Sequence, residues 1–232
     1  MFKKPVMVIT GTSKGLGRYL AEYYVEKGFQ IVGCSRGVID LELDSYQHFC
    51  LDVCDESSVN MMFKQIRKEY GRLDVLINNA GIASKNYVLL TSLKEVQDLL
   101  NTNFVGTFLF SRESVKLMKI NNYGRIIHLS SIHVPLAMEG TSVYGATKAS
   151  IEQFSKVLAR EVFQFGINVN ILSLSVVKNT GMENTLTEQI KNKILCQTIS
   201  KSQLSIHDVT HAINYLINEK SKMVTNQLLS LG

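Results

Sequence analysis

The chain has 232 residues, of which 45% are hydrophobic and 19% charged, so it is long enough for one domain or two small ones with a substantial core. Its 25 basic and 20 acidic residues leave a net charge of +5, spread without a basic run, which argues against a nucleic-acid partner. No segment is long and apolar enough to cross a membrane, and too few apolar residues precede the first glycine-rich segment for a signal peptide, so we expect a cytoplasmic protein.

Short apolar runs recur along the chain, and helical patterns lie between most of them. We expect buried strands at 6–9, 31–34, 49–51, 75–77, 126–129, 169–172 and 228–231. Strands that alternate with helices favour a parallel sheet covered on both faces, here a doubly wound α/β sheet of about seven strands. No linker or repeat interrupts the pattern, so residues 1–232 are predicted to form a single domain.

The first predicted strand runs directly into a glycine-rich segment, Thr10–Gly17, and a helical apolar pattern begins at Leu16. A glycine-rich turn between a strand and a helix is the context in which backbone N–H groups and the helix dipole bind a phosphate. Gly11 permits the tight turn, Gly15 lets the backbone approach a pyrophosphate, and Gly17 lets the helix pack close to the strand. The sequence therefore predicts a dinucleotide site at this turn.

A second candidate site combines Ser131 with Tyr144 and Lys148. The Tyr-x-x-x-Lys spacing places a phenol and an ammonium on one face of a helix, one turn apart. A cation beside a phenol favours the phenolate and lowers its pKa toward the range in which proton transfer is efficient. The Ser131 hydroxyl is suited to hold a substrate oxygen. Taken singly, each residue also has a structural explanation, such as a turn for Ser131 or a core position for Tyr144.

Together these motifs resemble the short-chain dehydrogenase/reductase family. The segment Thr10–Gly17 fits its Thr-Gly-x-x-x-Gly-x-Gly turn, and Asn-Asn-Ala-Gly at 78–81 matches its second motif. Its catalytic tetrad is matched in order and spacing by Asn103, Ser131, Tyr144 and Lys148. The resemblance runs from about residue 5 to the C-terminus. It implies a Rossmann-like fold and is strongest to carbonyl reductases that act like 3-oxoacyl-carrier-protein reductase.

The end of the second predicted strand bears on the choice of cofactor, because an acid there binds the NAD ribose whereas an arginine accepts the NADP 2′-phosphate. Here the strand is followed by Arg36, and Lys14 in the glycine-rich turn adds a second cation. The acids Asp40, Glu42 and Asp44 come later and are expected to face water. The sequence therefore favours NADP(H) over NAD(H).

The resemblance also implies the positions that contact this cofactor. They are Gly11, Ser13, Lys14, Gly15, Leu16, Gly17, Arg36, Asp52, Val53, Asn79, Gly81, Tyr144, Lys148, Val177 and Thr180. Within this set, Asp52 and Val53 are expected to flank the adenine, and Asn79 and Gly81 to border the adenosine ribose. No metal site is expected, because the cysteines at 34, 50, 54 and 196 lack metal-ligand spacing. Cys34 and Cys50 fall in predicted strands and are expected to be buried, reduced thiols.

The implied reaction is hydride transfer between the nicotinamide and a ketone or secondary alcohol. Tyr144 would donate a proton to the developing alkoxide, and Ser131 would hydrogen-bond the carbonyl oxygen. Lys148 would lower the tyrosine pKa and bind the nicotinamide ribose, while Asn103 would connect it to bulk water. His133, two positions after Ser131, is expected to line the pocket or face solvent rather than to act in catalysis.

Three functions are left open. A small-molecule carbonyl such as a 3-oxoacyl thioester fits the resemblance. A sugar, cyclitol or natural-product intermediate is the alternative, and a dinucleotide-sensing protein without catalysis is a third. The family's Pro-Gly after the sixth strand is replaced by Leu174-Ser175, which makes contacts at Val177 and Thr180 uncertain. Residues 176–204 are expected to form a mobile loop that covers the substrate. The chain stops at Gly232, several residues earlier than usual in the family, which together with the altered loop suits a specialised pocket.

Two predicted helices, at about 104–120 and 143–165, are apolar on more than one side. A helix of this kind must bury more surface than one sheet face can cover. The resemblance points the same way, since family members commonly pair through these helices. We therefore expect a homodimer or homotetramer.

Overall fold

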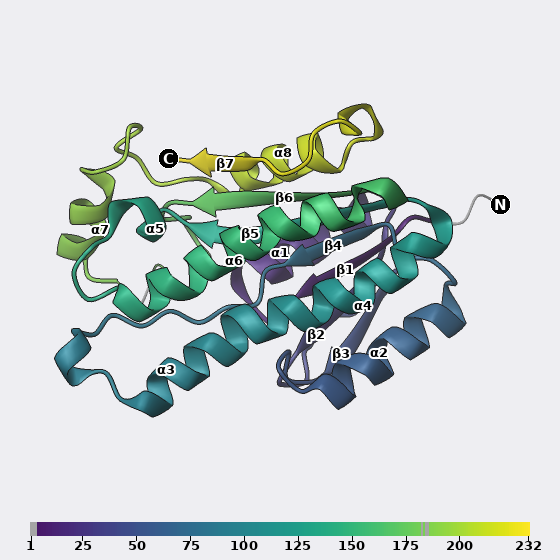
Figure 1. The fold of residues 1–232 in the computed structure, drawn as a ribbon, viewed down its shortest axis with the longest axis horizontal. Helices are drawn as coiled ribbons and strands as arrows, with labels where there is room; N and C mark the ends of the chain where they lie inside the picture. Colours follow the sequence, from purple (N-terminus) through teal and green to yellow (C-terminus); the bar gives the residue numbers. More distant parts are fainter. Residues whose placement is uncertain (1–3, 182, 184–185) are drawn as a thin grey trace.

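The computed structural model describes residues 4–181, 183 and 186–232, which form one sheet with helices on both faces (Figure 1). Its strands are β1 (Val6–Thr10), β2 (Gln30–Ser35), β3 (Tyr46–Cys50), β4 (Val75–Asn78), β5 (Gly124–Ser131), β6 (Ile167–Leu174) and β7 (Leu228–Leu231). All seven are parallel, in the order β3-β2-β1-β4-β5-β6-β7. The predicted doubly wound α/β fold is confirmed.

Eight α-helices connect or follow these strands within the described residues. They are α1 (Gly15–Glu26), α2 (Glu56–Glu69), α3 (Leu93–Leu99), α4 (Gly106–Asn121), α5 (His133–Leu136), α6 (Ser142–Val162), α7 (Glu188–Leu195) and α8 (Ile206–Ile217). Helices α2, α4 and α6 contribute to the hydrophobic core on one face of the sheet, and α1 and α8 to the core on the other (Figure 1). In this described part of the chain, each helix is too short or too polar to span a bilayer.

Strand β1 shows why both faces must be covered. Val6 and Val8 belong to the core beneath α2, α4 and α6, whereas Met7 and Ile9 belong to the core beneath α1 and α8. Successive side chains of a strand point to opposite faces, so a continuous apolar run fits a sheet that is buried on both sides.

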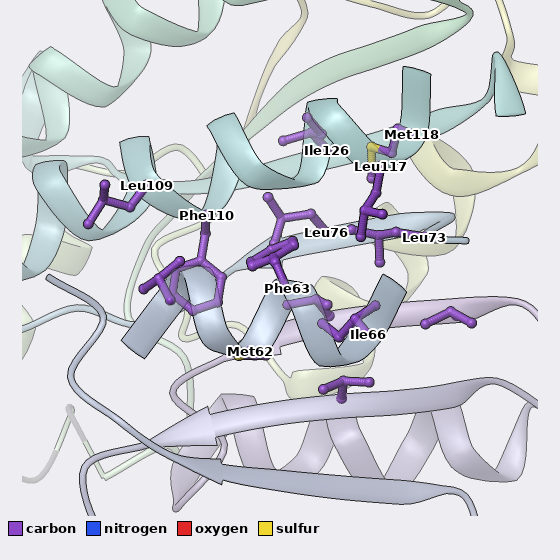
Figure 2. Packing of buried hydrophobic residues seen from close by; sticks show 14 of the residues in the cluster. Met62, Phe63, Ile66, Leu73, Leu76, Leu109, Phe110, Leu117, Met118 and Ile126 are labelled. Carbon is purple, nitrogen blue, oxygen red and sulfur yellow. The ribbon is translucent and has the colours of Figure 1, made fainter. Parts of the chain in front are cut away.

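The core between α2 and α4 is packed by large side chains from both helices (Figure 2). Phe63 of α2 and Phe110 of α4 meet edge to face, with ring centroids 5.6 Å apart. Met62 and Ile66 lie on the same side of α2 and are fully buried. This packing holds α4, the helix that precedes β5, against the sheet.

The strand order reverses between β1 and β4, the point at which an open parallel sheet binds ligands beyond its carboxyl ends. Helices α5 and α7 lie together beyond the ends of β5 and β6 (Figure 1). The glycine-rich turn follows β1 at the same edge. The predicted cofactor and catalytic segments therefore meet at one edge of the sheet.

The prediction that Cys50 is buried was wrong. Cys50 is exposed, whereas Cys34 is fully buried as expected. The reason is position: β3 is the outermost strand, begins at Tyr46 rather than at residue 49, and ends at Cys50. An edge strand has a neighbour on one side only, so its last side chain is not covered.

The expectation of a loop over 176–204 was also incomplete. Helix α7 occupies Glu188–Leu195, and Ile194 is fully buried against Ile132 and Met138. Its N-terminus is capped by the Thr187 hydroxyl, which accepts from the Ile190 N–H. Residues 182, 184 and 185 of this segment lie outside the described residues.

Candidate active site

The glycine-rich turn has the shape that an anion requires. Gly11 and Gly15 adopt φ values of 75° and 59°, which residues other than glycine rarely adopt. A Cβ on Gly17 would overlap the Gly11 carbonyl, so the helix approaches the strand as predicted. Among the described residues no side chain caps the start of α1, which leaves its first N–H groups and positive dipole end for a phosphate. The turn therefore fits a dinucleotide pyrophosphate.

Gly15 has a second close neighbour that the sequence did not suggest. A Cβ at this position would overlap the carbonyl of Thr180, in the segment after β6. Two predicted cofactor contacts far apart in sequence are thus side by side. Val177 is buried in the same hydrophobic cluster as Leu16, so the segment after β6 is anchored to α1.

Asn79 holds the turn from the neighbouring strand end. Its side-chain amide donates to the carbonyls of Thr10 and Gly11, at 2.8 and 3.2 Å. Its backbone N–H donates to the Thr10 hydroxyl at 3.0 Å. The side chain predicted to border the adenosine ribose therefore supports the shape of the phosphate turn.

The residues expected around the adenine lie at the end of β3. The Asp52 carboxylate accepts from the backbone N–H of Cys54 at 3.1 Å. The Val53 side chain is 7% exposed and packs so tightly against Gly106 that a Cβ there would overlap it. Both residues are thus fixed in place, one by the backbone and one by the start of α4.

The end of β2 presents cations to solvent. Arg36 and Lys14 are both exposed, and within the described part of the chain neither makes an ion pair. Asp40 faces water as expected, with its side chain 86% exposed, and it pairs with Arg18 at 2.7 Å. This hydrogen-bonded guanidinium lowers the pKa of the Asp40 carboxyl. Asp40 is therefore paired with Arg18, and the charges of Arg36 and Lys14 are accessible to a ligand.

The catalytic candidates gather at the carboxyl end of β5. Ser131 ends that strand, while Tyr144 and Lys148 lie one turn apart on α6. Their exposed fractions are 5%, 8% and 6%. The Lys148 ammonium lies 5.9 Å from the centre of the tyrosine ring and donates to the Leu129 carbonyl at 2.9 Å. The predicted face of the helix therefore exists, and it is buried.

Burial changes the proton chemistry that the sequence suggested. It raises the pKa of the Tyr144 phenol, which the nearby Ser131 hydroxyl lowers only in part. It also lowers the pKa of Lys148 from 10.5 to about 8. The net shift of the Tyr144 pKa is therefore upward, because the cost of burying the phenolate outweighs the hydrogen bond with Ser131.

Asn103 lies in a π-helical segment, Leu100–Val105, between α3 and α4. Its side chain is fully buried, so Asn103 does not lie on a solvent-facing side of the helix. Its side chain exchanges hydrogen bonds with the backbone of Ile82, at 2.8 and 2.9 Å, and donates to Thr147 at 3.0 Å. Wide helical turns of this kind occur often at functional sites.

Gly81 brings Asn103 and Lys148 close together. A Cβ on this glycine would lie 3.3 Å from the Asn103 amide oxygen and 3.6 Å from the Lys148 nitrogen. The Asn103 side chain is committed to its bonds with Ile82 and Thr147. It therefore positions the loop beside Lys148 and makes no hydrogen bond to the ammonium itself.

His133 is closer to the catalytic group than the sequence indicated. Its Nδ1 lies 2.9 Å from the Ser131 hydroxyl, and its ring meets Tyr144 edge to face at 5.6 Å. Burial lowers the pKa of His133, and the charge of Lys85 lowers it further. The His133 imidazole therefore contacts the side chains of both Ser131 and Tyr144.

A doubly wound sheet with a phosphate-binding turn at its switch point and a buried Ser–Tyr–Lys group defines an oxidoreductase of the α/β class. The chain belongs to the short-chain dehydrogenase family, whose model matches residues 5–191.

Two relatives and one solved structure place the chain within this family. 3-Oxoacyl-(acyl-carrier-protein) reductase FabG of Escherichia coli (strain K12) is 29% identical over 237 residues, covering 100% of this chain and 97% of the relative. The reductase of the same name from Buchnera aphidicola subsp. Schizaphis graminum (strain Sg) is 32% identical, with 99% and 96% covered. The structure titled "ElxO with NADP Bound" superposes with a TM-score of 0.89 at 27% identity, over 98% of this chain and 97% of that one.

Proposed function

We propose that this protein is an NADP(H)-dependent oxidoreductase that interconverts a ketone and a secondary alcohol, and that it reduces a 3-oxoacyl thioester. The observation that carries the proposal is the meeting of the buried Ser131, Tyr144 and Lys148 group with the glycine-rich turn at one sheet edge. Relatives across the whole chain are named 3-oxoacyl-carrier-protein reductases, and a structural neighbour is titled as binding NADP.

When bound, the nicotinamide supplies or accepts the hydride. Ser131 orients the carbonyl oxygen of the substrate, and Tyr144 donates its phenolic proton to that oxygen as charge develops. Burial raises the pKa of the Tyr144 phenol, which disfavours loss of its proton to solvent. Lys148, with a pKa of about 8, holds a positive charge near the phenol at neutral pH and stabilises the phenolate left after proton donation.

The cofactor preference is proposed from Arg36 and Lys14, which reach solvent beside the turn while Asp40 is bound by Arg18. An arginine fork matches a phosphate well. Calorimetry of NADPH and NADH binding tests this in the wild type and in Arg36→Asp. We expect NADPH to bind at least about tenfold tighter, that is ~1.4 kcal/mol, and the preference to vanish in the variant.

The matched control is Arg67→Asp, the same charge change on an exposed position of α2. It should leave both affinities unchanged. Equal binding of the two cofactors by the wild type would contradict the preference. Loss of the preference in Arg67→Asp as well would show that only net charge matters.

The substrate class is proposed from the surroundings of the catalytic group. Ile132 and Met138, close to Ser131 in the chain, pack with Val176 and Ile194 into an apolar cluster under α7. Apolar surroundings next to the proposed catalytic group suit an acyl chain better than a polyhydroxylated sugar. Turnover on a panel of 3-oxoacyl thioesters, sugars and cyclitols tests this. Activity confined to polyols would establish the alternative dehydrogenase instead.

We also propose that the protein pairs through α4 and α6. Phe108 on α4 and Val157 on α6 are large apolar side chains with 38% and 46% of their surface exposed. Val157→Glu should shift the protein toward the monomer in sedimentation. Ile199→Glu, at a position 97% exposed after α7, is the control and should leave the assembly intact. An unchanged assembly in Val157→Glu would contradict pairing through this face. A cytoplasmic location remains a prediction.

A further inference from the structure

A chain of polar side chains joins the glycine-rich turn to the turn that carries Arg36. The Thr12 hydroxyl lies 2.7 Å from the Tyr46 hydroxyl, which lies 2.8 Å from Nδ1 of His48. Nε2 of His48 lies 3.1 Å from the carbonyl of Gly37. Ser35 closes the group, since its hydroxyl lies 3.1 Å from the same ring nitrogen and donates to the Gly37 carbonyl at 3.0 Å.

The carbonyl at the end of this chain fixes the direction of its hydrogen bonds. A carbonyl oxygen only accepts, so Nε2 of His48 carries a proton and donates it to Gly37. In the neutral ring Nδ1 is then the acceptor, and the Tyr46 hydroxyl donates to it. Burial raises the pKa of Tyr46 to about 12, which keeps this hydroxyl a donor. The Tyr46 oxygen in turn accepts from Thr12.

The absence of a side chain at Gly33 leaves room in the sheet for these hydrogen-bonded side chains. A Cβ on Gly33 would overlap both the Tyr46 hydroxyl and the Thr12 hydroxyl. Gly33 faces His48 across the β2–β3 register, so both strands contribute to the same face. Any larger residue at this point of β2 would separate Thr12 from Tyr46.

We infer that Tyr46 and His48 are positioning residues for cofactor choice: they hold the Ser35–Gly37 turn against the glycine-rich turn so that Arg36 meets the 2′-phosphate. This inference rests on the proposed NADP(H) preference and extends it to two residues of β3. His48 acts through the backbone of Gly37, next to Arg36, and Tyr46 acts through His48.

The test measures dissociation constants for NADPH and NADH by calorimetry. His48→Phe keeps a flat ring and removes both ring nitrogens, so NADPH should bind about tenfold more weakly while NADH binding changes less than about twofold. His48→Gln can still donate to Gly37 and should recover part of the loss. The matched control is His211→Phe on α8, which is exposed and should change neither constant.

A double variant separates positioning from other roles. Because His48 acts through Arg36, Arg36→Ala and the double variant Arg36→Ala/His48→Phe should bind NADPH equally. Additive losses would contradict the inference, and so would equal weakening of NADPH and NADH in His48→Phe, which is the mark of a purely structural role. If the wild type itself showed no preference for NADPH, the proposed cofactor would fail and this inference with it. If the wild type and His48→Phe preferred NADPH to the same degree, the proposed cofactor would stand and only the inference about His48 would fail.

Discussion

The proposed catalytic group and the proposed cofactor-selecting turn lie at the same sheet edge, but one is buried and the other is exposed. Ser131, Tyr144 and Lys148 are at most 8% exposed, and burial shifts the pKa of the tyrosine and of the lysine. Arg36 and Lys14 are exposed and are presented by turns. The proposed chemistry therefore relies on desolvated groups held by packing, whereas the proposed cofactor selection relies on solvated charges held by backbone geometry. Substitutions in the two regions should have different signatures.

The largest effect is expected from Tyr144→Phe, which keeps the buried ring and removes the acid. Turnover should fall about a thousandfold, within the range that general acid catalysis supplies. The dissociation constant of the cofactor should change little, because the phenol acts on the substrate. Steady-state kinetics and calorimetry measure the two quantities.

The control for this variant is Tyr24→Phe, at a fully buried tyrosine remote from the site. The Tyr24 hydroxyl donates to Asn214 at 3.0 Å. Its loss should lower the free energy of unfolding by about 1 kcal/mol and leave turnover intact. Unimpaired turnover in Tyr144→Phe would contradict the role of Tyr144 as the acid, whereas cofactor binding without turnover in the wild type would support a dinucleotide-sensing protein.

Lys148 gives a pH signature that a surface cation would lack. Its pKa is about 8 in the folded protein and ordinarily 10.5, so between these values the unfolded chain holds more protons than the folded one. The free energy of unfolding contributed by Lys148 therefore rises with pH across this window, by on the order of 3 kcal/mol. Below pH 8 the buried charge lowers stability by a constant amount.

Lys148→Met removes that dependence, and urea unfolding measures it. The wild type should gain stability relative to the variant between pH 7 and pH 10, and the variant should also lose turnover. A difference that stays constant over this range would show that Lys148 is not desolvated.

The glycine-rich turn can be tested without touching a charge. Gly15→Ala adds a methyl that overlaps the Thr180 carbonyl in a backbone conformation with φ of 59°. Cofactor binding should weaken at least about tenfold, since either the turn or the segment after β6 must move. Gly28→Ala is the matched control: its φ is 86°, but its Cβ would meet nothing within 4 Å, so only stability should fall. Equal cofactor affinities in the two variants would contradict the importance of the Thr180 contact.

The smallest effect concerns α7. Ile194→Val removes one methyl from the buried contact with Ile132 and Met138 and should cost about 1 kcal/mol locally. KM for the substrate should rise less than tenfold, with cofactor affinity unchanged. Ile213→Val, equally buried in α8, should lower stability without changing KM. If both variants changed KM alike, α7 would have no special role over the substrate.

The sequence predicted the parts of the molecule that rest on local patterns. Apolar runs located six strands closely and β3 only at its C-terminal end, and the turn at Thr10–Gly17 was recognisable because its glycines stand between a strand and a helix. The tetrad was recognised by spacing, and the structure brings Ser131, Tyr144 and Lys148 together as that spacing implies. Their chemical roles remain predictions.

The rest depends on contacts between distant segments. Nothing local marks Tyr46 and His48, which matter only because β3 lies beside β2. Helix α7 was missed because its apolar face is short and finds its partners in residues distant in the sequence, namely Ile132, Met138 and Val176. The tyrosine pKa was misjudged because spacing places Lys148 beside Tyr144 but does not reveal how deeply both are buried.

The most direct test of this division between chemistry and selection compares Tyr144→Phe with Arg36→Asp in two assays. One measures the NADPH dissociation constant, and the other measures turnover of a 3-oxoacyl thioester at saturating cofactor. We predict that Tyr144→Phe loses turnover and keeps NADPH affinity, whereas Arg36→Asp loses NADPH affinity and keeps turnover once saturated. If either variant lost both properties to a similar degree, the two regions would not be separable and the account would be contradicted.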